Sequence, residues 1–72
     1  MPKLPVLSGR DVVSALERLG FVQMRQRGSH VILQRDGVGV VVPLHRELKT
    51  GTLAGVIRQA GLSQDEFLAA AK

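Results

Sequence analysis

Residues 30–43, HVILQRDGVGVVVP, place two apolar runs on either side of Asp36-Gly37. An Asp-Gly pair between apolar runs is typical of a two-residue β-hairpin turn, because both residue types tolerate a positive φ. We therefore predict strands at residues 30–35 and 38–43. Pro43 should end the ladder, because proline has no amide proton to donate.

A two-residue turn also predicts which side chains share a face of the sheet. It sets Arg35 opposite Val38, and facing pairs then alternate between the two faces along both strands. One face should therefore carry Val31, Leu33, Arg35, Val38, Val40 and Val42.

A further strand is favoured at residues 21–27, joined to the hairpin by a tight connection that contains Gly28. A two-residue connection would place Val22 and Met24 on the apolar face, which we expect helices to cover. Phe21 falls on the other face by parity, although it could curl under the first helix. That open face should carry Gln23, Arg25, Arg27, His30, Ile32 and Gln34.

Two longer helices flank the sheet in the sequence. Ser8 is a good N-cap, and Gly20 is a suitable left-handed residue to end the first helix. The second helix begins at Thr50-Gly51-Thr52 and is closed by Gly61, and Ser63 caps a short last helix. The order of helix, three antiparallel strands, helix and short C-terminal helix predicts an α+β fold with helices on one face of the sheet.

Composition narrows the possible functions. The 72 residues suffice for a single domain over 1–72, and the lack of cysteine excludes disulfides and thiolate sites. The net charge of +4 favours a polyanionic or acidic partner. We expect no cofactor and no metal site, because His30 and His45 lack further convergent ligands. The absence of an apolar run approaching ~20 residues and of a secretion signal predicts a cytoplasmic protein without a membrane segment.

His30 is the strongest candidate for chemistry. It should lie on the open sheet face with Arg25 or Arg27 as its cross-strand neighbour. A neutral imidazole accepts a proton from a hydroxyl, and neighbouring arginines bind phosphate. RNA supplies its own nucleophile in the 2′-hydroxyl, so these groups would suffice to cut RNA without a metal.

Other candidates surround His30 in the sequence. His45 is a secondary candidate, as a second acid or base in the loop after Pro43, although loop histidines are more often structural. Ser29 is interpreted as a turn residue beside the RNA, because adjacent strand residues point to opposite faces and direct activation by His30 is disfavoured. The remaining candidates for phosphate contacts are Arg25, Arg27, Arg46 and Lys49, each weighed against an ordinary solvated surface.

Several motifs together resemble the HicA family of toxins. They are Gly20-Phe21, Arg27-Gly28-Ser29-His30, Val42-Pro43-Leu44-His45, Gly51-Thr52-Leu53 and Ile57-Arg58-Gln59-Ala60-Gly61. The resemblance implies a double-stranded-RNA-binding-like fold, mRNA interferase activity with His30 as the catalytic residue, and a HicB-like antitoxin partner. It also implies a toxin that is monomeric when free and hetero-oligomeric with its antitoxin.

Two other functions are compatible with the residues. A non-catalytic RNA-binding module could use the same surface through backbone and 2′-hydroxyl contacts. A small DNA-binding domain is less favoured, because the helix after Thr52 offers only Arg58 and Gln59, near its end, for groove contacts.

Overall fold

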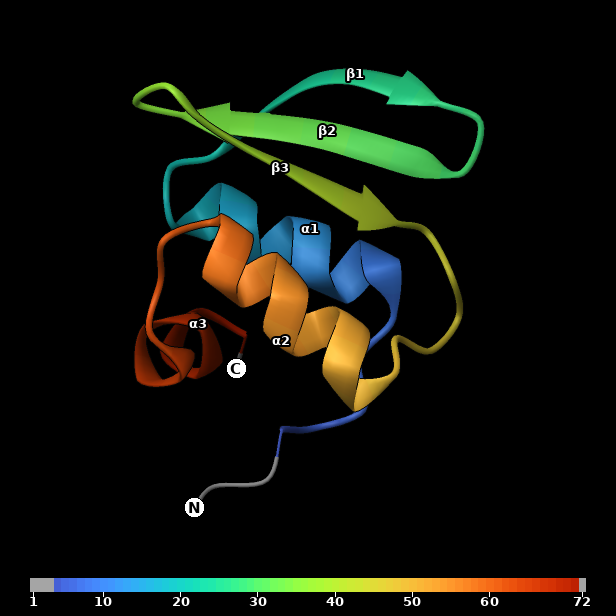
Figure 1. The fold of residues 1–72 in the computed structure, drawn as a ribbon, viewed down its shortest axis with the longest axis vertical. Coiled ribbons are helices and arrows are strands. Elements are labelled where there is room, and N and C mark those ends of the chain that lie inside the picture. Colours follow the sequence, from blue (N-terminus) through green and yellow to red (C-terminus); the bar gives the residue numbers. More distant parts are fainter. Residues whose placement is uncertain (1–3, 72) are drawn as a thin grey trace.

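The computed structural model describes residues 4–71. Its three strands form one antiparallel sheet in the order β1-β2-β3, and α1 and α2 both lie beneath one face of this sheet (Figure 1). The other face is open in the described part of the chain. The elements are α1 (Gly9–Arg18), β1 (Val22–Arg27), β2 (His30–Arg35), β3 (Val38–Pro43), α2 (Thr50–Gln59) and α3 (Gln64–Ala70). The predicted α+β fold is confirmed.

The predicted hairpin register is confirmed. Arg35 pairs with Val38, Leu33 with Val40, and the alternation continues to His30 opposite Pro43. The turn has positive φ at both central positions, 49° at Asp36 and 80° at Gly37, which matches the twist of the strands. Val31, Leu33, Val40 and Val42 consequently point at the helices and are buried.

The predicted burial of Val22 and Met24 is wrong. Val22 is 60% exposed and Met24 57% exposed. A β-bulge between Gln23 and Arg25 adds one unpaired residue to β1, so every residue before it moves to the opposite face. Gln23, predicted on the open face, therefore pairs with Leu33 on the helix side, and Val22 turns outward.

The same bulge explains the position of Phe21. Parity without a bulge assigns Phe21 to the open face, but the ring is only 3% exposed. Its amide donates to the Leu16 carbonyl at 3.0 Å, which completes the glycine-ended helix stop that begins at Gly20. The shifted register thus buries the Phe21 ring in the core, while Val22 and Met24 are left largely exposed.

The helix ends follow the predicted signals. Ser8 and Asp11 form a capping box at the start of α1, and Ser63 and Glu66 form another at the start of α3. Gly61 ends α2 with φ +72°, as Gly20 ends α1 with φ +96°. No helix within residues 4–71 is long and apolar enough to cross a membrane.

Candidate functional site

His30 is the first residue of β2 and is exposed. It follows a two-residue turn, Gly28-Ser29, and pairs with Arg27 on β1. Because paired residues lie on the same face of a sheet, Arg27 is the cross-strand neighbour of His30 on the open face. The structure therefore brings a guanidinium and an imidazole together, as the hairpin geometry predicts.

Arg25 extends the cationic surface along β1. It pairs with Ile32, which lies two residues beyond His30 on the same face. Ile32 in turn pairs with Val41 on β3. Arg25, Ile32 and Val41 thus form a cross-strand row on the open face, with a cationic residue on β1 and apolar residues on β2 and β3. None of the described strand residues is a carboxylate. This face is suited to anions and to partners that also bury apolar side chains.

The turn before His30 is attached to the segment that follows β3. The Leu44 amide donates to the Ser29 carbonyl at 2.6 Å, one residue beyond the regular ladder. The Gly9 amide donates to the His45 carbonyl at 2.9 Å, which links the same segment to the first residue of α1. These two bonds hold the residues before His30, the segment after β3 and α1 together.

Gly9 is required by this close approach. A Cβ built at Gly9 clashes with the Pro43 carbonyl oxygen and lies 2.7 Å from the Leu44 Cα. Both obstacles are backbone atoms, which a rotamer change cannot move. The N-terminus of α1 therefore packs against the segment carrying His45 only because residue 9 has no side chain.

The other predicted residues lie in or beside the turns. Ser29 occupies the second position of the β1-β2 turn, immediately before His30. His45 and Arg46 are exposed in the segment between β3 and α2, and exposed Lys49 is the N-cap of α2 without a side-chain capping bond. The strand pairing places Arg25 and Arg27 on the His30 face. It does not include His45, Arg46 or Lys49.

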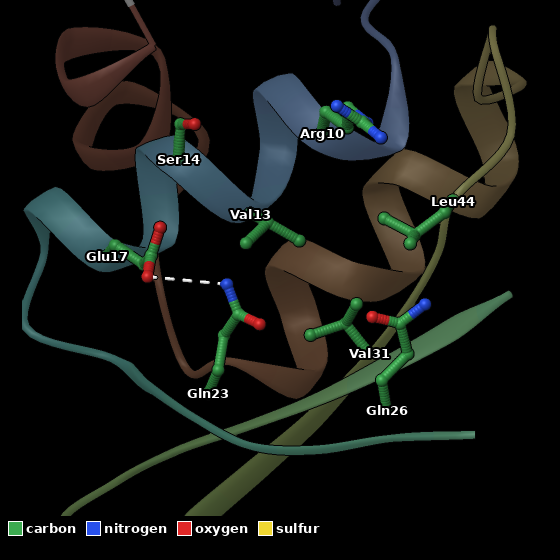
Figure 2. Close-up of a pocket in the computed structure, with 8 residues that line it drawn as sticks. All are labelled: Arg10, Val13, Ser14, Glu17, Gln23, Gln26, Val31 and Leu44. Atoms are coloured by element: carbon green, nitrogen blue, oxygen red, sulfur yellow. Dashed lines mark hydrogen bonds between the residues drawn. The ribbon is translucent and has the colours of Figure 1, made fainter. Parts of the chain in front are cut away.

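A groove lies between α1 and β1, on the side of the sheet opposite to His30. Its volume is about 330 Å³. Figure 2 shows Gln23 and Gln26 projecting from β1 toward α1 across this groove, with Gln23 donating to Glu17 at 3.4 Å. The lining residues are Arg10, Val13, Ser14, Glu17, Gln23, Gln26, Val31 and Leu44.

Chemically, the open face offers a proton acceptor and phosphate ligands. Groups of three or more histidine, aspartate or glutamate residues that could hold a metal do not occur in residues 4–71. The sequence pattern did not reveal the contacts of Gly9, Gln26 and Leu44, because each depends on a segment distant in sequence or on the direction of a turn peptide. Only the glycine at position 9, just after a helix N-cap, carried a signal.

Comparison with known proteins gives the family. No curated protein matches the chain significantly. The family model described as "HicA toxin of bacterial toxin-antitoxin" matches residues 9–62, from the glycine that α1 requires to the residue after the α2 stop. This match spans α1, the whole sheet and α2, including the turn that presents His30. The chain therefore belongs to the HicA toxins of bacterial toxin-antitoxin systems.

Proposed function

We propose that this toxin is a metal-independent endoribonuclease that cleaves mRNA with His30 as general base. The observation that carries the proposal is the exposed His30 paired with Arg27 on an open sheet face without carboxylates, in a chain of a toxin family. The guanidinium would neutralise the phosphate whose neighbouring 2′-hydroxyl gives its proton to the imidazole. Metal assistance is unnecessary because RNA brings its own nucleophile.

The reaction is an in-line transesterification. His30 takes the proton of the 2′-hydroxyl, the 2′-oxygen forms a bond to the adjacent phosphorus, and the bond from phosphorus to the 5′-oxygen breaks. The leaving 5′-oxygen receives a proton, and His45 is our candidate donor. The products are a 2′,3′-cyclic phosphate and a 5′-hydroxyl end. DNA is not a substrate, because it lacks the 2′-hydroxyl.

RNA binding is assigned to the cationic residues around this face. Arg25 and Arg27 would contact phosphates from β1, and Ser29 would contact RNA from the turn. Arg46 and Lys49, from the segment between β3 and α2, would contact phosphates further along the strand. The net charge of +4 supports attraction of the RNA backbone.

The partner in this proposal is a HicB-like antitoxin, which binds the toxin in the cytoplasm. An acidic antitoxin surface would be attracted to Arg25 and Arg27, and its apolar residues would cover Ile32 and Val41. Covering this face would exclude RNA from His30. The toxin is expected to be a monomer when free and a hetero-oligomer with the antitoxin.

The test is cleavage of a long single-stranded RNA in excess EDTA by antitoxin-free protein. We expect His30→Ala to lower the rate by about 10²- to 10⁴-fold, while it keeps the native unfolding midpoint and RNA affinity. His45→Ala, measured beside it, shows whether the leaving group requires that residue. Cleavage that stops in EDTA would contradict the metal-independent mechanism. Native protein that binds RNA as tightly as His30→Ala without cutting it would instead indicate a non-catalytic RNA-binding module.

A further inference from the structure

The Gln26 side chain makes its hydrogen bond to the turn that presents His30. Its Nε2 donates to the Gly28 carbonyl at 2.9 Å. That carbonyl belongs to the peptide group between Gly28 and Ser29, which is the central peptide of the two-residue β1-β2 turn. The bond therefore acts on the peptide whose orientation defines the turn type.

The orientation of this peptide is a choice between two states. At present φ is +57° at Gly28 and is not positive at Ser29, which is the pattern of a type II′ turn. Rotating the central peptide by roughly half a turn converts type II′ into type I′ and requires a positive φ at the second position. Ser29 disfavours that state because it has a Cβ, and the Gln26 bond disfavours it further.

The next peptide group is held independently. The Ser29 carbonyl, in the peptide between Ser29 and His30, accepts from the Leu44 amide at 2.6 Å. Both peptide groups before His30 are thus held by a donor from outside the turn, one a side chain and one a backbone amide. Removing the Gln26 donor would leave only the Cβ of Ser29 to oppose rotation of the Gly28-Ser29 peptide.

Gln26 does this from the face opposite to His30. It pairs with Val31 on β2, whose side chain is buried toward the helices, and it projects into the α1-β1 groove (Figure 2). RNA bound on the open face would not touch it. Its effect on cleavage must pass through the turn.

We propose that Gln26 is a positioning residue, which holds the Gly28-Ser29 peptide and thereby fixes where His30 meets the RNA. This inference rests on the proposed function of His30. Gln23 provides a matched comparison, since it is also an exposed glutamine of β1 that lines the same groove. Its Nε2 donates to Glu17 and not to the turn.

The experiment compares Gln26→Ala and Gln26→Glu with Gln23→Ala and Gln23→Glu. Glutamate has nearly the size of glutamine but cannot donate when ionised. Gln23→Glu adds the same charge to the same strand but places it against the Glu17 carboxylate, so Gln23→Ala is the control for the lost hydrogen bond and Gln23→Glu is the control for the added charge. We expect both Gln26 variants to lower kcat roughly 3- to 10-fold, which is the loss expected for one net hydrogen bond. KM for RNA should stay within about twofold in the alanine variants.

Amide NMR spectra supply a readout that does not depend on activity. The Ser29 amide lies in the peptide that Gln26 holds, so its signal should shift or broaden in the Gln26 variants and stay native in the Gln23 variants. Native Ser29 and His30 signals in Gln26→Ala would overturn the proposal.

The kinetic outcomes separate this proposal from the proposed function. Native kcat in Gln26→Ala, together with an inactive His30→Ala, would overturn the role of Gln26 and leave the role of His30 standing. An equal loss of kcat in the Gln26 and Gln23 variants would show a general effect of substitutions in β1, and would also overturn the positioning role of Gln26. A native protein that leaves RNA intact would overturn the proposed function, and the catalytic role of Gln26 with it.

Discussion

The Leu44 amide donates to the Ser29 carbonyl at 2.6 Å, which joins the segment after β3 to the residue before His30. The carbonyl of the next residue, His45, accepts a hydrogen bond from the Gly9 amide. The backbone position of the turn before His30 therefore depends on α1 as well as on the strands. Substitutions at the start of α1 should therefore change the position of His30, the candidate catalytic residue.

Gly9→Ala should destabilise the protein by about 1–3 kcal/mol, because the new methyl group must displace the backbone of Pro43 and Leu44. It should also lower the cleavage rate by moving the segment bonded to Ser29. Gly55→Ala is the control, since a Cβ there meets nothing within 4 Å in the middle of α2. That variant should gain about 0.5–1 kcal/mol from helix propensity. Urea unfolding measures both changes, and equal stabilities of the two variants would contradict the close approach at Gly9.

Arg27→Gln should weaken RNA binding and reduce its dependence on salt. One lost phosphate contact lowers the slope of log K against log salt by about 0.7 for a single strand. Arg58→Gln is the control, because Arg58 lies near the end of α2 beneath the other face of the sheet. Binding is measured at several salt concentrations with His30→Ala as the background, so that the RNA is not cut. Equal salt slopes for the two variants would show that Arg27 does not contact an RNA phosphate.

Arg35→Ala should destabilise the fold by about 1–3 kcal/mol without a direct effect on RNA cleavage. Its guanidinium donates to the Leu19 carbonyl at 2.7 Å and lies 4.8 Å from the centre of the Phe21 ring. The Arg35 side chain therefore links β2 to the C-terminal end of α1. The thermal midpoint should fall by several degrees relative to Arg58→Ala. An unchanged midpoint would show that neither contact contributes net stability.

Stability should decrease at acidic pH through Glu66. Hydrogen bonds with Ser63 in the capping box lower the pKa of the Glu66 carboxyl below its ordinary value of 4.5. The bond from the Ser63 backbone amide has the largest effect, and the bond with the Ser63 side chain follows. A lowered folded-state pKa means that the stabilisation is present above about pH 4.5 and is lost as pH falls through the folded-state pKa. Glu66→Gln should flatten this part of the profile of unfolding free energy against pH. Asp65→Asn, with the same charge change in the same helical turn, is the control, and an equal flattening there would contradict the role of the capping box.

Local signals predicted much of the fold. Asp36-Gly37 predicted the register of the β2-β3 hairpin as far as His30. A two-residue turn fixes the first facing pair, and every later pair follows from it by counting along the two strands. Ser8, Gly20, Gly61 and Ser63 predicted the helix ends, because capping depends on residues within four positions. The connection containing Gly28 predicted Arg25 or Arg27 as the cross-strand neighbour of His30, and the structure shows that it is Arg27.

The bulge in β1 could not be predicted in this way. Its effect is to exchange the faces of Val22 and Gln23, and it depends on the burial of Phe21 against the end of α1. Periodicity alone assigns each residue to a face by counting from the turn, and one extra residue reverses the result for everything before it.

The sequence by itself determined the α+β order, the helix caps, the hairpin register and the placement of an imidazole beside a guanidinium on one face. Each of these depends on neighbours within a few residues or on a single turn. Only the tertiary structure decided how the turn before His30 is held, through Gln26, Leu44 and the space left at Gly9. Those contacts depend on the direction of individual peptide groups and on how closely two distant backbones approach, which no spacing of residue types specifies.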